Sequence, residues 1–564
     1  MRHRGCVEME IRFLAYVMFG CSLGASLATA RAESKVALWK DGKATSFLVP
    51  PSKDERASRL ARSTFSYNLG RFYGLQLPLA NGNEKAGTYI VLGTPANNAA
   101  LSSLVRSGLN LTKEDIGDEG FQLLTYQKGA SRYVIAYGRT PRALKSASQE
   151  LIFYRMPATR NAGLVDWPVN EVRKPEFAYR GIYMLPCWSP GDSMESWQRV
   201  LRFNSELALN RTWFWLDGFP LAGHKGLYNG TPLSDAANVQ SLIDLANGED
   251  MKFYIGGGWL TWHMAKEVGT DLRKAQDYYL EYLRTFHDFS GFYLEPTGEP
   301  TVEAGKVSPQ QSEKWRAEAE ALRSLTRTVA QQKPQFEFAV AIGQYNSPEY
   351  VAEMAKLDPK HVYWWWCWGH PVRDHASSLF PKILAWQSSF LSPSDDQSEW
   401  GTRRAPGPEM RGLSGIATSY DPGAGWGNPW NGLPSKIEWQ TMTPSPRARN
   451  FDPYTIPYFY LQYFVRERAW NLGLTEERFS ERLQRRLFDA DAPADAGQQY
   501  VKLSQMALRA YDRKSISREE LAPSGNWLKA MRQRSWTPRT EDTLARMEFA
   551  QTHLLELARG GAAK

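Results

Sequence analysis

The spacing of apolar and polar residues divides the chain into three regions of different character. Between residues 33 and 172, a helical period over 55–73 precedes short β-branched and aromatic runs at 89–92, 121–126 and 133–137, and a second helical period covers 141–154. This order predicts a small α/β domain. The polar stretch 161–177 contains several prolines, and we interpret it as the connection to the next domain.

From residue 179 the pattern becomes a sustained alternation of strand and helix. Helical periods are predicted at 194–209, 235–246, 272–287, 310–332, 348–357 and 377–388. Strands are predicted at 180–185, 212–216, 252–255, 291–294, 336–341, 362–366 and 413–418, with an eighth between 383 and 391. Alternation of this length indicates a parallel sheet, and a (β/α)8 barrel over 173–452 is its natural closure. A doubly wound sheet would also alternate, but PCWSPGD after the first strand is no glycine-rich phosphate loop.

The last part of the chain is helical and charged. Helical periods cover 454–471, 475–488, 494–511 and 540–559, which predicts a helical C-terminal region over 453–564. The predicted fold class is therefore α/β: a (β/α)8 barrel preceded by a small α/β domain and followed by helices.

The first 32 residues have the pattern of a secretory signal. Arg2, Arg4 and Arg12 precede an apolar run over 13–28, and Ala30-Arg31-Ala32 supplies a small-residue cleavage site. We expect cleavage after Ala32 and a periplasmic or extracellular protein. No later run reaches the ~18 apolar residues that a membrane helix needs, so no membrane span is expected.

The net charge of +8 restricts the classes of binding partner but does not identify one. Basic residues are scattered among acidic ones, whereas a nucleic-acid binder gathers them on one face, so no nucleic-acid partner is expected. The charge is compatible with an ordinary basic exported protein, and also with attraction of an anionic substrate such as a uronic-acid polymer.

Cysteines and cofactor motifs are sparse. Once the signal is removed, Cys187 and Cys367 remain, and they could form a disulfide or stay as two buried thiols. The chain has no CxxC or HExxH pattern, so no metal site is expected. After the predicted signal it also lacks a G-x-S-x-G elbow, a Walker loop and a Rossmann fingerprint, and no cofactor is expected.

Tryptophan is concentrated in the predicted barrel. Fifteen of the 21 tryptophans lie between residues 188 and 430, and most follow predicted strand ends, which open onto one face of a barrel. A flat indole suits the C–H face of a sugar ring, although many indoles would simply fill the core. The candidate substrate-binding residues at these strand ends are Trp188, Trp215, Trp262, His263, Tyr345, Trp366, Trp368, His370, Tyr420, Trp426 and Trp430.

Carboxylates accompany the indoles. Glu295 and Glu299 follow the strand 291–294, while Asp217 and Asp421 follow two other strands. Hydrolysis of a glycoside usually needs a carboxylic acid at the leaving oxygen and a second carboxylate as base or nucleophile. These four residues are therefore the candidate catalytic set, although each could instead form a salt bridge or cap a helix.

Several segments resemble known exo-glycosidases. ARSTFSYNLGRFYG, TYIVLG, DEGFQLL and YVIAYGRTPRALKSASQEL resemble the small domain that precedes the barrel in α-glucuronidases and β-hexosaminidases. RGIYMLPCW resembles the start of that barrel, and GFYLEPTGEP resembles the fourth-strand segment of the xylan α-glucuronidases. LSGIATSYDPGAGW and RERAWNLGLTEERFSERL are similar to that family's last strand and following helix.

The resemblance implies a hydrolase of terminal sugars with Glu299 as the general acid and Glu295 as the second choice. The chain departs from the α-glucuronidases, which carry the general base on strands after the fourth, because FAVAIGQYN and YWWWCWGHP contain no Asp or Glu. The chain also lacks the adjacent Asp-Glu pair typical of β-hexosaminidases. A β-N-acetylhexosaminidase that uses the substrate's own acetamide, and a carbohydrate-binding protein without catalysis, remain the alternatives.

Overall fold

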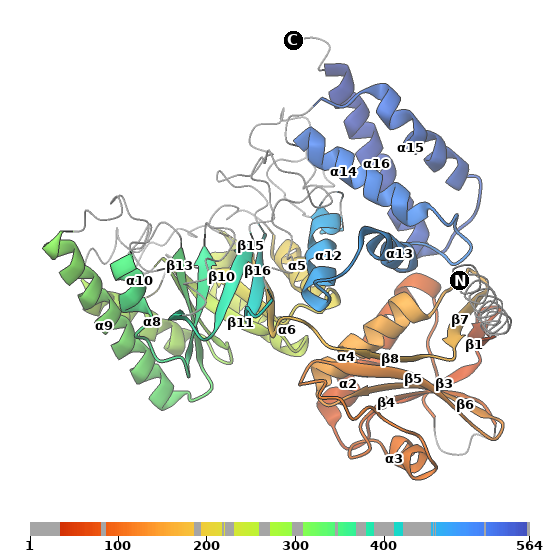
Figure 1. Ribbon diagram of the computed structural model, residues 1–564, viewed down its shortest axis with the longest axis horizontal. Coiled ribbons are helices and arrows are strands. Elements are labelled where there is room, and N and C mark those ends of the chain that lie inside the picture. Colours follow the sequence, from red (N-terminus) through yellow and green to blue (C-terminus); the bar gives the residue numbers. More distant parts are fainter. Residues whose placement is uncertain are drawn as a thin grey trace, which may run out of the picture.

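The computed structural model describes residues 34–80, 86–184, 186, 193–216, 219, 221, 231–258, 271–295, 308–343, 348–367, 379–387, 411–420, 453–454, 456, 458–511 and 515–560. They form a small α/β domain, a barrel and a group of C-terminal helices (Figure 1). Among these residues, no helix combines the length and apolarity that crossing a bilayer requires.

Eight parallel strands close into the barrel, which confirms the predicted fold class. The eighth strand appears where the sequence predicted it, at residues 383–387, and the helix predicted over 377–388 is therefore wrong in that part. In chain order the strands are β9 (Tyr179–Met184), β10 (Arg211–Trp215), β11 (Lys252–Gly258), β12 (Gly291–Glu295), β13 (Glu337–Gly343), β14 (Val362–Cys367), β15 (Ile383–Gln387) and β16 (Gly415–Tyr420).

Helices pack around the outside of the barrel. Leucines, phenylalanines and valines on their inner faces join the outward-facing strand residues in one apolar layer. That layer explains why the strands are apolar almost throughout, since both faces of a parallel sheet are covered. The helices are α5 (Met194–Glu206), α6 (Ala236–Gly248), α8 (Leu272–Thr285), α9 (Pro309–Gln332) and α10 (Pro348–Met354), with a short 3-10 turn, η3 (Pro232–Ser234).

The barrel interior is filled by aromatic rings, and glycines on neighbouring strands make room for them. A Cβ on Gly181 would lie 2.4 Å from the ring of Trp213, and one on Gly291 would lie 2.6 Å from the ring of Tyr254. Both distances are too short for a real Cβ, so only glycine at these two positions lets the rings pack against the neighbouring strand. The interior is thus a packed core that can place side chains at fixed positions.

The N-terminal domain holds two sheets, ordered β3-β4-β6-β5-β8 and β2-β1-β7. The stretch 161–177, predicted to be a connection, instead contains the strands β7 and β8, which pair antiparallel with β1 and β5. The domain's elements are β1 (Ser34–Lys40), β2 (Lys43–Ala44), β3 (Ser46–Val49), α2 (Glu55–Tyr73), β4 (Thr88–Gly93), α3 (Ala99–Arg106), β5 (Phe121–Lys128), β6 (Ser131–Gly138), α4 (Pro141–Glu150), the π-helix η1 (Leu151–Arg155), β7 (Ala162–Trp167) and β8 (Asn170–Arg173).

Helix α2 has the bounds that its periodicity predicted. Asp54 caps its first turn by accepting a hydrogen bond of 2.9 Å from the amide of Ala57. Gly74 ends it with φ of 64°, the left-handed conformation that glycine adopts without strain. The bounds of this helix are thus set by capping residues within one turn of its ends.

The C-terminal region consists of five helices: α12 (Tyr458–Trp470), α13 (Glu476–Leu487), α14 (Ala496–Tyr511), α15 (Arg518–Met531) and α16 (Pro538–Gly560). Sequence periodicity missed α15 because Pro523 and Gly525 interrupt it. A capping box between Ser517 and Glu520 starts this helix, and buried Leu521 and Leu528 hold it against the others.

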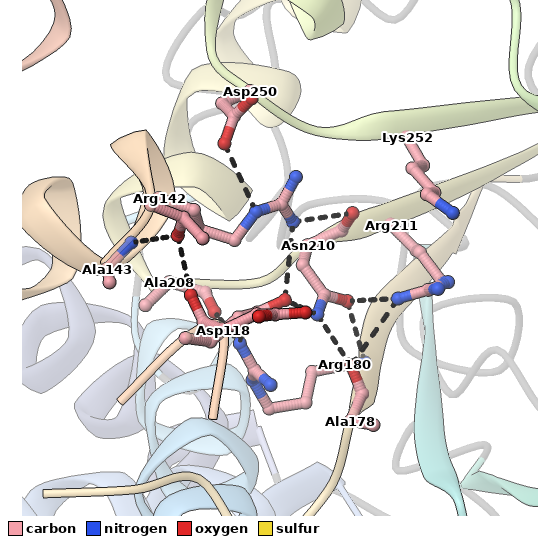
Figure 2. A network of polar contacts seen from close by, with 12 residues as sticks. Asp118, Arg142, Ala143, Ala178, Arg180, Ala208, Asn210, Arg211, Asp250 and Lys252 are labelled. Atoms are coloured by element: carbon pink, nitrogen blue, oxygen red, sulfur yellow. Dashed lines mark hydrogen bonds and ion pairs between the residues drawn. The ribbon is translucent and has the colours of Figure 1, made fainter. Parts of the chain in front are cut away.

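The N-terminal domain is bound to the amino end of the barrel by a polar network (Figure 2). Arg142 of α4 pairs with Asp250 at 3.4 Å and donates to the carbonyl of Asn210 at 3.0 Å. The Asn210 side chain in turn donates to the carbonyl of Ala178 at 2.7 Å. Residues 178 and 210 directly precede β9 and β10, and residue 250 lies two residues before β11. The N-terminal domain therefore contacts the barrel at the amino ends of these strands.

A buried ion cluster joins the N-terminal domain to the C-terminal helices. Glu150 of α4 accepts two 2.9 Å hydrogen bonds from Arg482 of α13 and one of 2.6 Å from Arg173 of β8. Burial opposes the charge on Glu150, but Arg173 and then Arg482 outweigh it and hold its pKa well below the ordinary value. The two regions also share one apolar core, so they support each other.

Candidate active site at the carboxyl end of the barrel

Strand β12 places Glu295 at the carboxyl end of the barrel. Its residues alternate: Tyr293 faces the interior, whereas Phe292 and Leu294 face the surrounding helices. Glu295 continues the inward series, because it lies two residues after Tyr293. Its exposed fraction is 8%, so this carboxylate is buried at the end of the barrel where barrel enzymes carry their active sites.

Two tyrosine hydroxyls donate hydrogen bonds to Glu295. The hydroxyl of Tyr293 lies 2.5 Å from Oε1, and the hydroxyl of Tyr183 lies 3.1 Å from the same atom. Tyr183 belongs to β9, which is three places away from β12 in the barrel. The contact therefore spans the interior, and only closure of the barrel can produce it.

Aromatic rings surround this group. The ring centroids of Tyr183 and Tyr293 are 4.9 Å apart, and those of Tyr293 and Trp365 are 4.7 Å apart. Trp215, at the end of β10, lies 6.0 Å from Tyr183 between centroids. The indole N–H of Trp365 is buried and has no hydrogen-bond partner in the part of the chain that the structure describes. A ligand or water that reached this depth would find a donor there.

The glycine run on β11 brings the backbones of two strands close together. Gly256 and Gly258 pair with Tyr293 and Glu295 of β12. A Cβ on Gly256 would lie 1.9 Å from the carbonyl oxygen of Tyr293, so any side chain here would displace β12. Gly256 thus allows β11 to lie this close to β12.

The opposite end of the barrel also holds a glutamate, in a different setting. Glu337 at the start of β13 pairs with Lys252 at 2.9 Å and Arg211 at 3.6 Å, and it accepts a hydrogen bond from Tyr254. Burial opposes its ionisation, but Arg211 and Lys252 outweigh that cost and lower the pKa of Glu337. Arg211 also stacks on Tyr179, with 3.8 Å from guanidinium to ring centroid.

The structure unites two of the predicted residues, Glu295 and Trp215, at one end of the barrel. Tyr420 ends β16 and pairs there with Met184, while its side chain lies outside the described residues. Also outside them lie Glu299, Asp217, Asp421, Trp188, Trp262, His263, Tyr345, Trp368, His370, Trp426 and Trp430, together with Cys187 of the possible disulfide. Their roles stay predictions.

Trp366 does not line the interior. It packs in the layer between barrel and helices, together with Trp364, whereas Trp365 points inward. Successive residues of a strand face opposite sides, so only one parity of the WWWCW run can enter the barrel. This position takes Trp366 away from the substrate contact that the sequence analysis expected.

Sequence reasoning missed Tyr183, Tyr293 and Trp365. Tyr293 could have been found, because it lies two residues before Glu295 and shares its face. Tyr183 and Trp365 required the barrel register, which no local pattern contains.

The geometry supports chemistry by a carboxylate held among aromatic rings. Oε1 of Glu295 accepts two hydroxyl hydrogen bonds, which fix its direction, and aromatic rings pack against the two donors. A carboxylate in this state can accept a proton or stabilise a developing positive charge. Within the described ranges, no group of three or more His, Cys, Asp or Glu side chains is arranged to hold a metal ion.

Two solved structures share this fold over nearly the whole chain. "Structure of CpGH84B" superposes with a TM-score of 0.51 and 12% identity, covering 94% of this chain and 88% of that one. "Structure of CpGH84D" gives 0.50 and 10%, with the same coverage. At this identity the likeness shows the fold. No family model matches the chain, and no curated protein matches it.

Proposed function

We propose that this protein is a glycoside hydrolase that removes a terminal sugar from an oligosaccharide or polysaccharide at the carboxyl end of its barrel. The observation that carries the proposal is Glu295, a buried carboxylate at the end of the fourth barrel strand, held by two tyrosines among indoles. The fold supports it, because CpGH84B and CpGH84D, which share it, belong to glycoside hydrolase family 84, a hexosaminidase family.

The proposed reaction assigns one role to each glutamate near β12. Glu299 protonates the glycosidic oxygen as the bond to the anomeric carbon breaks, and Glu295 stabilises the positive charge that develops on the sugar. Water then adds to the anomeric carbon and returns a proton to Glu299. Asp217 and Asp421 are the further candidates for positioning that water.

Two substrate classes follow from different observations. The family of the similar structures favours an N-acetylhexosamine, whose acetamide oxygen attacks the anomeric carbon in place of a protein nucleophile. That route also explains why the strands after the fourth carry no Asp or Glu in FAVAIGQYN and YWWWCWGHP. The net charge of +8 instead favours a uronic acid. We place the N-acetylhexosaminide first, and we propose that the signal pattern exports the enzyme.

Product analysis with amino-sugar and uronic-acid glycosides tests the proposal. We expect release of a monosaccharide, and Glu299→Gln should reduce turnover at least ~100-fold, the usual scale of general acid catalysis. Glu313→Gln, an exposed carboxylate on α9, is the matched control and should keep full activity. Binding of glycans without turnover across the panel would instead identify a carbohydrate-binding protein, and full activity of Glu299→Gln would remove that residue from the acid role.

A further inference from the structure

The hydroxyls of Tyr183 and Tyr293 both donate to Oε1 of Glu295. We propose that Tyr183 and Tyr293 are positioning residues that keep the Glu295 carboxylate ionised and fixed in direction for the reaction. This inference rests on the proposed function, and it deepens it by stating what prepares the site.

The geometry gives the carboxylate two anchors of different origin. Tyr293 holds Oε1 from the same strand, at 2.5 Å, and Tyr183 holds it from across the barrel, at 3.1 Å. An anchor on its own strand alone would let Glu295 swing with the end of β12. The second anchor, on β9, ties that strand end to the opposite side of the barrel.

The anchors themselves cannot move freely. Tyr183 is 1% exposed and Tyr293 is fully buried. Both rings pack on Trp365, with centroid distances of 5.2 Å and 4.7 Å, and Trp365 packs on Trp213 at 4.6 Å. A hydroxyl on a locked ring costs little further entropy when it donates, so the hydrogen bonds are preorganised.

Hydroxyl donors favour the charged state of the carboxylate that accepts them. Among the described residues, the other titratable side chains facing the interior are Tyr254 and Tyr363, deeper in the barrel, and then Arg211, Tyr179 and Glu337 at its amino end. Gly258 of β11 pairs with Glu295, and the interior residues near the carboxyl ends of β10, β13 and β14 are Trp215, Ala341 and Trp365, none of which titrates. Tyr183 and Tyr293 are therefore the described groups whose removal should change the titration of Glu295.

A competing explanation is that the contacts merely satisfy two buried hydroxyls. The variants Tyr183→Phe and Tyr293→Phe, made singly and together, distinguish this explanation from the positioning role. Tyr363→Phe is the control. Tyr363 lies in the same aromatic interior, but its hydroxyl accepts from Trp213 at 2.7 Å. The control variant thus removes a buried tyrosine hydroxyl that does not contact Glu295.

The first readout needs no substrate. Acid titration of Glu295 is followed by the infrared difference between each protein and its Glu295→Gln counterpart. We expect the protonated carboxyl band to appear at higher pH in the Tyr183→Phe/Tyr293→Phe protein than in the wild type, and at unchanged pH in Tyr363→Phe. An unchanged titration in the double variant would overturn the proposal, whatever the activity.

The second readout uses the substrate identified by product analysis. We expect the double variant to lose at least tenfold in kcat with KM within twofold, and the acid side of its pH profile to move upward. Full kcat in an active enzyme would also overturn the proposal. If the wild type hydrolyses no glycoside, the proposed function fails and the catalytic part of this inference fails with it, while the infrared titration still decides whether the tyrosines hold the carboxylate.

Discussion

Each end of the barrel holds a glutamate that accepts a hydrogen bond from a tyrosine hydroxyl, but Glu295 is buried, Glu337 is half-buried, and the two sites differ in kind. At the amino end, Glu337 is paired with Arg211 and Lys252. At the carboxyl end, Glu295 accepts from Tyr183 and Tyr293. Two cations neutralise the carboxylate of Glu337, whereas the two hydroxyl donors orient the carboxylate of Glu295 without neutralising it. We therefore propose that the amino end serves stability and that the carboxyl end carries the chemistry.

The polar network at the amino end extends that difference. Arg142, Asn210 and Asp250 connect the N-terminal domain to the loops before β9, β10 and β11 (Figure 2). Substitutions in this network should act through folding. Substitutions around Glu295 should act through turnover.

The largest effect is expected from Glu337→Gln. It leaves Arg211 and Lys252 without their anion, and we expect the free energy of unfolding to fall by about 3 kcal/mol, at the low end for a broken buried pair because Glu337 keeps 21% side-chain exposure. Urea denaturation measures the loss, and turnover of the folded protein should stay within twofold. A stability equal to that of the wild type would contradict the assignment of this end to folding.

Glu295→Gln should give the opposite result. Glutamine keeps the shape and can still accept from Tyr183 and Tyr293, so we expect the melting temperature to change by no more than a few degrees. Turnover should fall about 100-fold because the charge is lost. Steady-state kinetics beside thermal denaturation tests both halves, and a destabilised protein with normal turnover would reverse the comparison.

Tyr363→Phe should have a smaller effect, and only on stability. The variant removes the hydroxyl that accepts from the indole of Trp213, and the buried N–H loses its partner. We expect a loss of about 1 kcal/mol with unchanged kcat and KM. Reduced turnover here would mean that the middle of the barrel, and not only its carboxyl end, shapes the site.

The smallest effect is expected in how the free energy of unfolding of the wild type and of Glu337→Gln depends on pH between 7 and 4. The pKa of Glu337 is lower in the folded protein than its ordinary value of 4.5, so its contribution is fully present above that value and is lost as pH falls through the folded pKa. The stability gap between wild type and Glu337→Gln should therefore stay nearly constant to about pH 4.5 and narrow below it. Urea denaturation at several pH values measures this stability gap, and a gap that narrowed well above pH 4.5 would contradict the lowered pKa of Glu337.

Local patterns predicted most of the elements. Helix α2 has its predicted bounds because Asp54 and Gly74 are capping residues that act within one turn. The barrel strands were found because both of their faces are apolar, and Glu295 because it ends such a strand. Helix α15 was missed because Pro523 and Gly525 break its periodicity, while buried leucines hold it in place.

The sequence by itself determined the alternation of strands and helices, and with it the barrel and the carboxylate at the end of its fourth strand. Closure of the sheet decided the rest. It brought Tyr183 to Glu295 across 112 residues of chain, and it turned Trp365 inward and Trp366 outward. The physical reason is that strand parity and register are set by packing between segments that are distant in sequence. The need for glycine at Gly181 and Gly256 likewise arises from contacts with the neighbouring strands.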